Sequence, residues 1–556
     1  MYSSKKNILQ TVALLKAHGI SHVVLSPGSR NAPLTQSFAC DPFFICHSIV
    51  DERSAGYFAI GLINRLQKPV ILCCTSGTAL LNYGPAVAEA YYQELPLIVV
   101  SADRSPAWIG EMDGQTLPQP GAFRTLVKKS VQLPEIQNEE DLWHCNRLVN
   151  EAILACKHHG SGPVHINVPV SEPLFDFSTD MLPEVRCIKS MTASDLPDMQ
   201  ELISIWKSSS KRMILVGQMQ PNDGQLSYLL EKMAFDGGCI VLAEHLSNIV
   251  SSTFIGNFDA LISALNEKES ENLAPELLIT IGGHIVSKQI KKFIRNHQPA
   301  NHWHISPSGN IVDTMMCLTY SIESEPAPFF EKFSDSVSHI TNTDYARKWL
   351  SASKAIYSPK SELPFSDITV AGAFLERIPD NSVLFAGNSS AIRNIQLYSI
   401  PASTYVFCNR GTNGIEGSVS TACGYATESE ALTFLLVGDL SFFYDLNALW
   451  NKHFPDNLRI LLVNNGGGGI FHLLPDLDKA EALEEYVSAH HETTAEGWVQ
   501  AAGLKYLKAE TMETLHSALT LFTKPSNEKA MVLEVFTTPE NNKSTSDNYY
   551  NKLKHQ

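Results

Sequence analysis

Short apolar runs alternate with amphipathic segments along most of this 556-residue chain. Near the N-terminus, apolar residues at positions 8, 9, 12 and 15 predict the buried face of a helix that ends at Gly19. Beyond it, each buried-strand pattern is followed by a polar loop and a helical segment. These strands are expected at residues 22–26, 43–50, 70–74, 97–101 and 164–168. The alternation predicts a doubly wound parallel sheet, whose functional residues lie in loops at the carboxyl ends of the strands.

The same alternation returns twice. Further strands are expected at residues 213–216, 240–243, 277–281, 383–386, 405–408, 432–437 and 458–463. The middle series lacks a Gly-x-Gly-x-x-Gly fingerprint, so no dinucleotide site is expected there. Residues 172–195 are an expected linker, a second linker carries Pro359 and Pro364, and the polar tail from Asn541 is expected to be frayed. The sequence therefore predicts an α/β protein with three doubly wound parallel-sheet domains, at residues 1–180, 196–340 and 360–556.

Bulk composition narrows the class of protein. The chain is too long for one core, and 44% hydrophobic with 18% charged residues is ordinary for a globular protein. It has no apolar run of about 18 residues, and its start leads into an amphipathic segment rather than a secretory signal. Eleven cysteines without a Cys-x-x-Cys pair predict reduced thiols. We expect a soluble, cytoplasmic protein that does not bind membranes.

The formal net charge of −16 argues against nucleic acid as a partner, because nucleic-acid binding is driven by cationic patches. It does not argue against small anionic substrates, since a few local arginines can bind those whatever the overall charge.

Two polar turns in the third series have the chemistry of a cation site. Asp439 lies in a Gly-Asp-Leu-Ser turn at residues 438–441, and Asn465 follows another expected strand 465 − 439 = 26 residues later. Their carboxylate and amide oxygens are hard ligands that suit Mg²⁺. The glycine run at residues 466–469 lets the backbone approach an ion and a diphosphate. A lone Gly-Asp after a strand is an ordinary turn, but joined to the glycine run it predicts a Mg²⁺–diphosphate anchor.

The spacing from Asp439 to Asn465 resembles the signature of thiamin diphosphate enzymes. In that family an acidic residue of the N-terminal α/β domain serves the cofactor, and Glu52 occupies the corresponding place. The resemblance implies that its carboxyl lies against N1′ of the aminopyrimidine and promotes the imino tautomer that deprotonates C2. Taken alone, Glu52 is also a first-turn acid that complements a helix dipole. The family closes its sites across a subunit boundary, which implies a homodimer or a dimer of dimers.

Six short motifs resemble one branch of that family, the 2-succinyl-5-enolpyruvyl-6-hydroxy-3-cyclohexene-1-carboxylate synthases of menaquinone biosynthesis. They are SPGSRNAPL at residues 26–34, DERSA at 51–55, TSGTA at 75–79, SADR at 101–104, NRG at 409–411 and GDLS at 438–441. The resemblance implies a transferase with thiamin diphosphate and Mg²⁺ (or Mn²⁺). It would decarboxylate 2-oxoglutarate and add the resulting succinyl carbanion 1,4 to isochorismate.

The resemblance also implies roles for individual residues. Substrate contacts are expected from Ser29, Arg30, Arg104, Gln115, Lys288, Arg393, Arg410, Ile470, Phe471 and Leu474. Cofactor contacts are expected from Glu52, Thr75, Ser389, Ile415, Gly438, Asp439, Leu440, Ser441, Asn465, Gly467, Ile470 and Phe471. Catalytic roles fall to Glu52, Gln115, Arg393 and Arg410. The metal ligands that the resemblance implies are Asp439, the Asn465 side chain and a carbonyl near Gly467.

Several alternatives stay open at this stage. Each arginine alone is equally compatible with a surface salt bridge, and Ile415 with simple core packing. Gly114 stands where relatives often carry Asn, which leaves the role of Gln115 open, and the glycine run leaves the third metal ligand open by one residue. His47 and His472 receive no role. The alternative functions are another thiamin diphosphate carboligase, such as an acetohydroxy acid synthase-like enzyme acting on pyruvate, and a non-catalytic ligand-binding relative.

Overall fold

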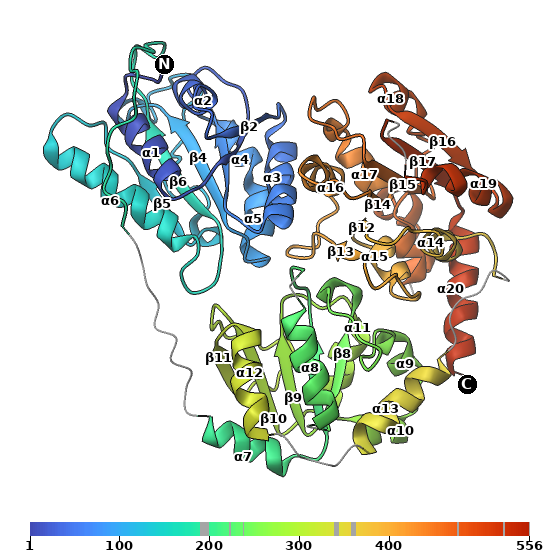
Figure 1. The fold of residues 1–556 in the computed structure, drawn as a ribbon. Coiled ribbons are helices and arrows are strands. Elements are labelled where there is room, and N and C mark those ends of the chain that lie inside the picture. The colour runs from blue at the N-terminus through green and yellow to red at the C-terminus, as the bar shows by residue number, and fades with distance from the viewer. Residues whose placement is uncertain are drawn as a thin grey trace. The chain divides into compact units, whose positions relative to one another are not determined.

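The structure is a computed structural model that describes residues 1–188, 199–221, 224–236, 238–337, 344–356, 363–474, 477–525 and 529–554 (Figure 1). The expected linker residues 189–195 and Pro359 lie outside these ranges. The chain divides into two compact units. Unit 1 comprises Met1–Ala193, Gly411–Glu430 and Tyr444–Leu458, and unit 2 comprises Ser194–Arg410, Ala431–Phe443 and Arg459–Gln556. Three parallel sheets flanked by helices confirm the predicted α/β class.

The first sheet has the strand order β2-β1-β3-β4-β6-β5 and is parallel throughout. Its strands are β1 (His22–Leu25), β2 (Ile45–Ser48), β3 (Val70–Cys74), β4 (Leu97–Asp103), β5 (Lys129–Gln132) and β6 (Val164–Pro169). Every residue of β3 and β4 is buried, as the apolar runs at residues 70–74 and 97–100 predict, and the polar residues Ser101 and Asp103 of β4 are buried as well. The edge strand β5 was not predicted, because only Val131 of its four residues is buried and no apolar run marks it.

The helices of unit 1 either flank this sheet or pack against a helix that flanks it. They are α1 (Lys6–Ala17), α2 (Ala32–Ala39), α3 (Glu52–Leu66), α4 (Thr78–Asn82), α5 (Gly84–Tyr92), α6 (Glu139–Ala155) and α16 (Ser418–Thr427), with 3₁₀ turns at Pro106–Trp108, Arg124–Leu126 and Leu446–Ala448. The helices α3 and α16 pack closely through glycines: a Cβ at Gly61 would lie 2.1 Å from the Thr421 carbonyl oxygen, and one at Gly424 would lie 2.1 Å from that of Phe58.

The central sheet, in unit 2, has the order β11-β10-β9-β7-β8. Its strands are β7 (Arg212–Val216), β8 (Ile240–Ala243), β9 (Leu277–Ile281), β10 (Asn301–Ser306) and β11 (Tyr320–Glu323). The surrounding helices are α7 (Gln200–Ser208), α8 (Gln225–Asp236), α9 (Phe258–Ala264), α10 (Glu267–Leu273), α11 (Lys288–Asn296), α12 (Pro326–Val337) and α13 (Asp344–Ala355), with a 3₁₀ turn at His245–Ser247. Separate apolar clusters lie on its two faces, as a doubly wound sheet requires.

The third sheet has the order β13-β12-β14-β15-β17-β16. Its strands are β12 (Val383–Ala386), β13 (Tyr405–Phe407), β14 (Thr433–Gly438), β15 (Leu458–Asn464), β16 (Lys505–Ala509) and β17 (Met531–Phe536). The helices of this part of the chain are α14 (Asp367–Leu375), α15 (Ser390–Ile395), α17 (Asp439–Tyr444), α18 (Glu496–Ala501), α19 (Met512–Phe522) and α20 (Pro539–Lys554). Shorter turns of helix occupy Gly469–Leu473, Leu477–Lys479 and Leu483–Val487.

The prediction of a frayed C-terminal tail is wrong. Residues 539–554 form the helix α20, which buries Asn542, Thr545, Tyr549 and Leu553. These positions recur every three or four residues and so lie on one helix face, and Tyr549 and Leu553 pack with Ala260 of α9. The polar composition of the exposed face concealed this narrow buried stripe. No helix within the described ranges is both long enough and apolar enough to cross a membrane.

Candidate functional site

Asp439 joins two turns of the third sheet. It follows β14 directly, is only 2% exposed, and accepts a hydrogen bond from the amide of Leu440 (2.6 Å) on Oδ1. Its Oδ2 accepts from the backbone amides of Asn465 (3.1 Å) and Gly467 (2.9 Å). The fold therefore brings together the acidic turn and the Asn-Gly turn that the sequence separates by 26 residues, because the carboxyl ends of the adjacent strands β14 and β15 share one edge.

The oxygen atoms of this turn fit a hard divalent cation. Burial raises the pKa of the Asp439 carboxyl above its ordinary value, although the amides of Leu440 and Gly467 act in the opposite direction. The Asn465 Oδ1 is buried and accepts no hydrogen bond from any described residue. Gly467 has a φ of +148°, and a Cβ there would lie 2.6 Å from the Ser488 carbonyl oxygen, so only glycine fits. A buried carboxylate beside an unpaired amide oxygen is the donor chemistry that Mg²⁺ takes.

This site is not a cluster of acids, histidines and cysteines. Within the described ranges there is no group of three or more such side chains arranged to hold a metal ion. His491 Nε2 lies 3.5 Å from Asp439 Oδ2 and is the one imidazole this close to the carboxylate among the described residues. Any cation bound here would thus depend on amide and carbonyl oxygens as well as on Asp439.

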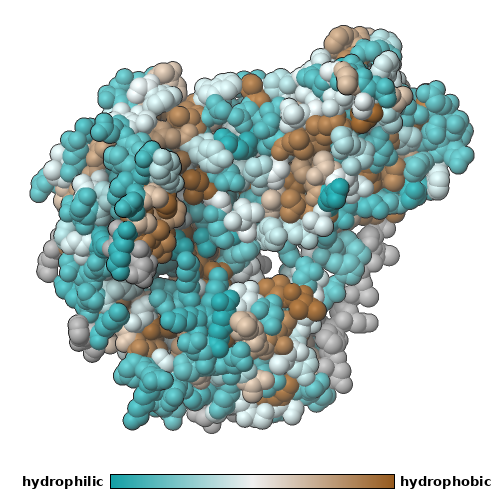
Figure 2. Space-filling view, turned by 180° about the vertical axis from the view of Figure 1, so that it is seen from behind, coloured by the Kyte–Doolittle hydropathy of each residue, from teal (hydrophilic) through white to brown (hydrophobic). Residues whose placement is uncertain are grey.

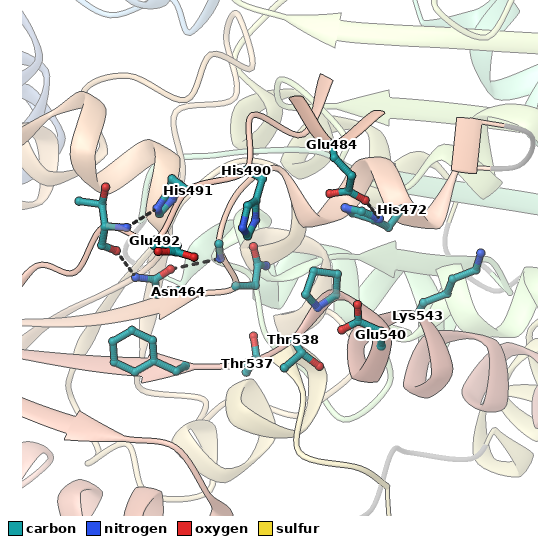
Figure 3. Close-up of a pocket in the computed structure, with 15 residues that line it drawn as sticks. Asn464, His472, Glu484, His490, His491, Glu492, Thr537, Thr538, Glu540 and Lys543 are labelled. Atoms are coloured by element: carbon teal, nitrogen blue, oxygen red, sulfur yellow. Dashed lines mark hydrogen bonds and ion pairs between the residues drawn. The ribbon is translucent and has the colours of Figure 1, made fainter. Parts of the chain in front are cut away.

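A cavity of about 560 Å³ adjoins the Asn-Gly turn within unit 2 (Figure 3). Figure 3 shows His490 and His491 on one side of Asn464 and Thr537 and Thr538 on the other. His472, for which no role was predicted, also lines this cavity, with Nδ1 3.8 Å from the Glu484 carboxylate. Asn465 lines it as well, so solvent and small molecules reach the turn from this side.

In unit 1, Glu52 is the first residue of α3, directly after the N-cap Asp51, whose carboxylate accepts from the Ser54 amide. Burial is the main cause that raises the pKa of Glu52, and the charge of Asp51 raises it further. Among the described residues, no other residue donates a hydrogen bond to the Glu52 carboxylate or forms an ion pair with it. A half-buried carboxyl with a raised pKa and no protein partner is suited to exchange a proton with a ligand.

Three loops of unit 1 meet where the strand order reverses, between β1 and β3. A Cβ at Gly28 would lie 2.3 Å from the Thr75 Cβ, so the loops after these two strands are in contact. The hydroxyls of Thr75 and Ser76 are buried and find no partner among the described residues. Gln115 has a positive φ of 57°, and its Cα would lie 3.2 Å from a Cβ at Gly77. Ligands of doubly wound sheets bind at such a reversal point.

The two arginines predicted in unit 1 are already engaged. Arg30 is 6% exposed and donates to the carbonyl of Val170 (2.9 Å), and it lies 3.2 Å from the Glu172 carboxylate. Arg104 pairs with Asp113 at 2.9 Å near the surface. Both salt bridges use carboxylates of flanking loops, which a carboxylate substrate can replace without changing the local charge.

The two arginines predicted in unit 2 lie close to each other. Arg410 is 6% exposed and donates to the Asn388 side chain (2.9 Å), while its Nε is buried and has no partner among the described residues. Arg393 donates to the carbonyl of Ser389, a residue held at a φ of +71°. Burial and the charge of Arg410 both lower the pKa of Arg393. Two neighbouring guanidinium groups of this kind favour an anionic ligand.

Two acids, Glu244 and Asp259, interact electrostatically with these arginines. Glu244 follows β8, is 2% exposed, and accepts from the amides of Val286 and Ser287. Burial raises its pKa to about 7, although the positive charge of Arg410 opposes the shift. Asp259 accepts from the Ser287 hydroxyl. Lys288, the remaining predicted cation, is the first residue of α11 and is exposed.

Sequence reasoning missed two acids that hold functional segments. Glu89 of α5 is fully buried and accepts from the amides of Gly411 (2.8 Å) and Thr412 (2.7 Å), which fixes the segment leading to Ile415. A single acid in the otherwise apolar stretch of α5 was the available signal. Asp367, the first residue of α14, accepts from the Asn465 side chain at 3.0 Å, and nothing in its local sequence marks it.

Comparison with known proteins decides the family. Residues 10–123 match the family model described as "Thiamine pyrophosphate enzyme, N-terminal TPP binding domain", and residues 184–386 match "Middle domain of thiamine pyrophosphate". The 2-succinyl-5-enolpyruvyl-6-hydroxy-3-cyclohexene-1-carboxylate synthase of Bacteroides thetaiotaomicron is 51% identical, and that of Flavobacterium johnsoniae is 40% identical; the alignments cover 100% and 98% of both chains, respectively. The chain belongs to this synthase family.

A solved structure supports the fold independently. The benzoylformate decarboxylase of Polynucleobacter necessarius aligns with a TM-score of 0.73, covering 97% of this chain and 99% of that one. At 18% identity this likeness shows the fold alone. The resemblance drawn from the six motifs is confirmed, as are the thiamin diphosphate fold and the cofactor itself.

The residues predicted from that family fall into two groups. Unit 1 contains Ser29, Arg30, Glu52, Thr75, Arg104, Gln115 and Ile415. Unit 2 contains Lys288, Ser389, Arg393, Arg410, Gly438, Asp439, Leu440, Ser441, Asn465, Gly467, Ile470, Phe471 and Leu474. Ile470 and Phe471 lie in the 3₁₀ turn Gly469–Leu473 immediately after the Asn-Gly turn, and Leu474 follows at 42% exposed.

Proposed function

We propose that this protein is a thiamin diphosphate-dependent transferase of menaquinone biosynthesis. It decarboxylates 2-oxoglutarate and adds the succinyl carbanion 1,4 to isochorismate, which gives 2-succinyl-5-enolpyruvyl-6-hydroxy-3-cyclohexene-1-carboxylate and CO₂. The observation that carries this proposal is the 51% identity, along the whole of both chains, to a synthase of that name. The geometry of the two sites agrees with the chemistry that the reaction needs.

Glu52 is the proton-handling residue of the proposal. Thiamin diphosphate, when bound, supplies a thiazolium ring that accepts the electron pair left by the departing CO₂. Glu52 would hold a proton at N1′ of the aminopyrimidine, and its raised pKa and lack of a protein partner support that role. The unpaired hydroxyls of Thr75 and Ser76 and the constrained Gln115 would line the same part of the cofactor and substrate pocket.

The Asp439 turn is the proposed anchor for Mg²⁺ or Mn²⁺ and the diphosphate. Asp439, Asn465 Oδ1 and a carbonyl near Gly467 would hold the ion, supported by the burial of both side-chain oxygens. The neighbouring backbone of residues 438–441 and the Ser389 turn would meet the diphosphate, and Ile415, Ile470 and Phe471 would supply apolar contacts to the cofactor.

The cationic residues would bind the carboxylates of the two substrates, each of which carries two. Arg393 and Arg410 fit this role best, because they lie close together and the Arg410 Nε remains unpaired among the described residues. Arg30, Arg104 and Lys288 would complete the set, with Ser29 and Leu474 adding contacts. For Arg30 and Arg104, substrate carboxylates would displace Glu172 and Asp113.

We also infer a homodimer, or a dimer of dimers, with active sites at the subunit interface. Exposed apolar side chains surround the Glu52 end of α3 within unit 1: Val50 and Tyr444 are each 50% exposed and Trp450 is 55% exposed. Arg53 stacks on Tyr444, and Trp450 donates to Asn447, which itself donates to Asp51, so these side chains form one group. Figure 2 shows apolar patches interrupting the polar surface. Such a group marks an interface.

A cytoplasmic location is part of the proposal. All eleven cysteines are free thiols in the structure, including the adjacent pair Cys73 and Cys74, which a reducing compartment keeps stable.

Donor preference tests the proposed function against an acetohydroxy acid synthase-like enzyme. Purified protein with thiamin diphosphate and Mg²⁺ is offered 2-oxoglutarate or pyruvate, each with and without isochorismate, and CO₂ release is followed. We expect release from 2-oxoglutarate that isochorismate stimulates. Preference for pyruvate would overturn the substrate assignment, and no turnover of either, in protein that binds the cofactor, would favour a non-catalytic relative.

A further inference from the structure

Asp367 is tied to the proposed metal turn by one hydrogen bond and to the rest of the fold by three. Its Oδ2 accepts from Asn465 Nδ2 at 3.0 Å. Its Oδ1 accepts from the Thr537 hydroxyl (2.6 Å) and from Asn542 Nδ2 (2.9 Å), and its own amide donates to Asn542 Oδ1 (2.8 Å). Asp367 thus links the start of α14, the end of β17 and the start of α20 to the loop after β15.

The hydrogen bonds fix which way each amide points. A carboxylate can only accept, so the atom that Asn465 turns toward Asp367 must be its NH₂ group. The orientation of the Asn542 side chain is fixed independently. The backbone amide of Asp367 can only donate, so the Asn542 atom that faces it must be the side-chain oxygen Oδ1. With its NH₂ committed to Asp367, Asn465 must turn its Oδ1 the other way, and that atom is buried without a partner in the described chain.

We propose that Asp367 is a positioning residue that fixes the amide orientation of Asn465, so that Oδ1 and not the NH₂ group faces the divalent cation. The inference rests on the proposed function, because it takes Asn465 as a metal ligand. Outer hydrogen bonds of this kind decide which atom of a side chain reaches a metal.

Replacing Asp367 by Asn removes a charge and also turns one of the two hydrogen-bond acceptors at position 367 into a donor. Thr537 and Asn542 still direct two donors at the position of Oδ1, so the new amide places its oxygen there. Its NH₂ group then faces the NH₂ of Asn465. Asn465 relieves the clash by turning over, which points its own NH₂ at the cation. We expect Asp367→Asn to weaken metal binding about 10–100-fold.

Exchanging the two side chains should repair this defect. In the double variant Asp367→Asn/Asn465→Asp, the amide at 367 donates to one carboxylate oxygen at 465, and the other oxygen is free for the cation. Each oxygen of a carboxylate accepts equally, so no wrong orientation exists. The exchange preserves the total charge and the number of hydrogen bonds between the two positions, and we expect it to recover metal affinity at least about tenfold over the single variant.

The test measures the Mg²⁺ concentration at which thiamin diphosphate binding is half-maximal, by calorimetry on the full chain, without reference to turnover. The matched control is Thr537→Val, which removes a different hydrogen bond to the same carboxylate and leaves the Asn465 contact untouched. We expect the control to resemble the wild type. If the single variant Asp367→Asn does not fold, the double variant is compared with the single variant Asn465→Asp, in which two carboxylates face each other. We expect the double variant to bind Mg²⁺ more tightly than Asn465→Asp alone.

The outcomes separate the possibilities. A wild-type Mg²⁺ requirement in Asp367→Asn overturns the inference and leaves the proposed function standing. Equal losses in Asp367→Asn and Thr537→Val, with no recovery in the exchange, also overturn it, because they would show a purely structural role. A wild-type protein that binds no thiamin diphosphate at any Mg²⁺ concentration overturns the proposed function itself.

Discussion

Replacing Glu52 by Gln tests the chemical role of the unit 1 site. The change keeps the shape of the side chain and removes the ability to share a proton. The carboxylate has no partner among the other described residues, so nothing else in this part of the fold is left unpaired by the substitution. Removal of the charge also relieves the desolvation that raises the pKa of Glu52. We therefore expect a folded, cofactor-binding protein that loses most of its turnover.

The size of the loss follows from the role. A positioned proton-transfer group contributes about 10²–10⁴-fold to rate, which corresponds to roughly 3–5 kcal/mol of transition-state stabilisation. The burial of Glu52 is partial, so we expect the effect on stability to be within about 1 kcal/mol. A large kinetic effect with a small stability effect is the signature of a catalytic group.

The assay is isochorismate-dependent CO₂ release from 2-oxoglutarate, with thiamin diphosphate affinity measured in parallel. The matched control is Glu139→Gln, the same chemical change at the first residue of α6, an exposed position that also follows directly after an N-cap. The control should keep its rate within about threefold. Wild-type turnover in Glu52→Gln, or equal losses in both variants, would refute the reasoning.

Four further predictions concern other parts of the fold. Asp439→Ala should raise the Mg²⁺ needed for cofactor binding by more than about tenfold, measured by calorimetry; an unchanged requirement would place the ion elsewhere. Gly61→Ala should lower the free energy of unfolding by about 1–3 kcal/mol, because its Cβ would lie 2.1 Å from a backbone oxygen of α16. Gly497→Ala, in open space within α18, should stabilise by about 0.5–1 kcal/mol instead; equal melting temperatures would contradict the proposed close packing. Burial raises the pKa of Glu244 from 4.5 to about 7, so its contribution to stability is complete below about pH 4.5 and is lost as the pH rises through about 7. Glu244→Gln should remove that loss of stability, which is of order 3 kcal/mol between low and high pH. The measurement is thermal unfolding of both proteins at about pH 5 and about pH 8, and the same change of stability with pH in both proteins would contradict the prediction. Mixing inactive Glu52→Gln and inactive Asp439→Ala chains should restore part of the activity if sites are shared between subunits, and no recovery despite subunit exchange would refute sharing.

Much of the architecture was predictable, because many buried parallel strands have a strong local signal, although the buried strands β10 and β17 were not predicted. The runs at residues 70–74, 240–243, 277–281 and 383–386 are strands with the expected bounds. The Asp439 and Asn465 turns could also be paired from sequence, because each follows such a strand and the strand ends share an edge. These predictions are strong because both faces of such a strand are buried. Nearly every residue of the strand is therefore apolar, and the polar turns at its two ends mark its bounds.

What escaped prediction depends on tertiary contacts. The edge strand β5 has one buried side chain and carries no apolar pattern. The helix α20 hides its buried stripe in a polar sequence. Asp367 and Glu89 are ordinary helix residues locally, and they become important only because distant loops place amides against their carboxylates. Such long-range hydrogen bonds leave no periodic trace in the sequence.

Product formation from both substrates tests the central claim most directly. The protein is incubated with 2-oxoglutarate, isochorismate, thiamin diphosphate and Mg²⁺, and the products are identified by mass spectrometry. The account predicts one new compound whose composition is that of isochorismate plus 2-oxoglutarate minus CO₂, absent when any one component is omitted. Formation of an acetohydroxy acid from pyruvate in its place, or no coupling of the two substrates by cofactor-loaded protein, would contradict it.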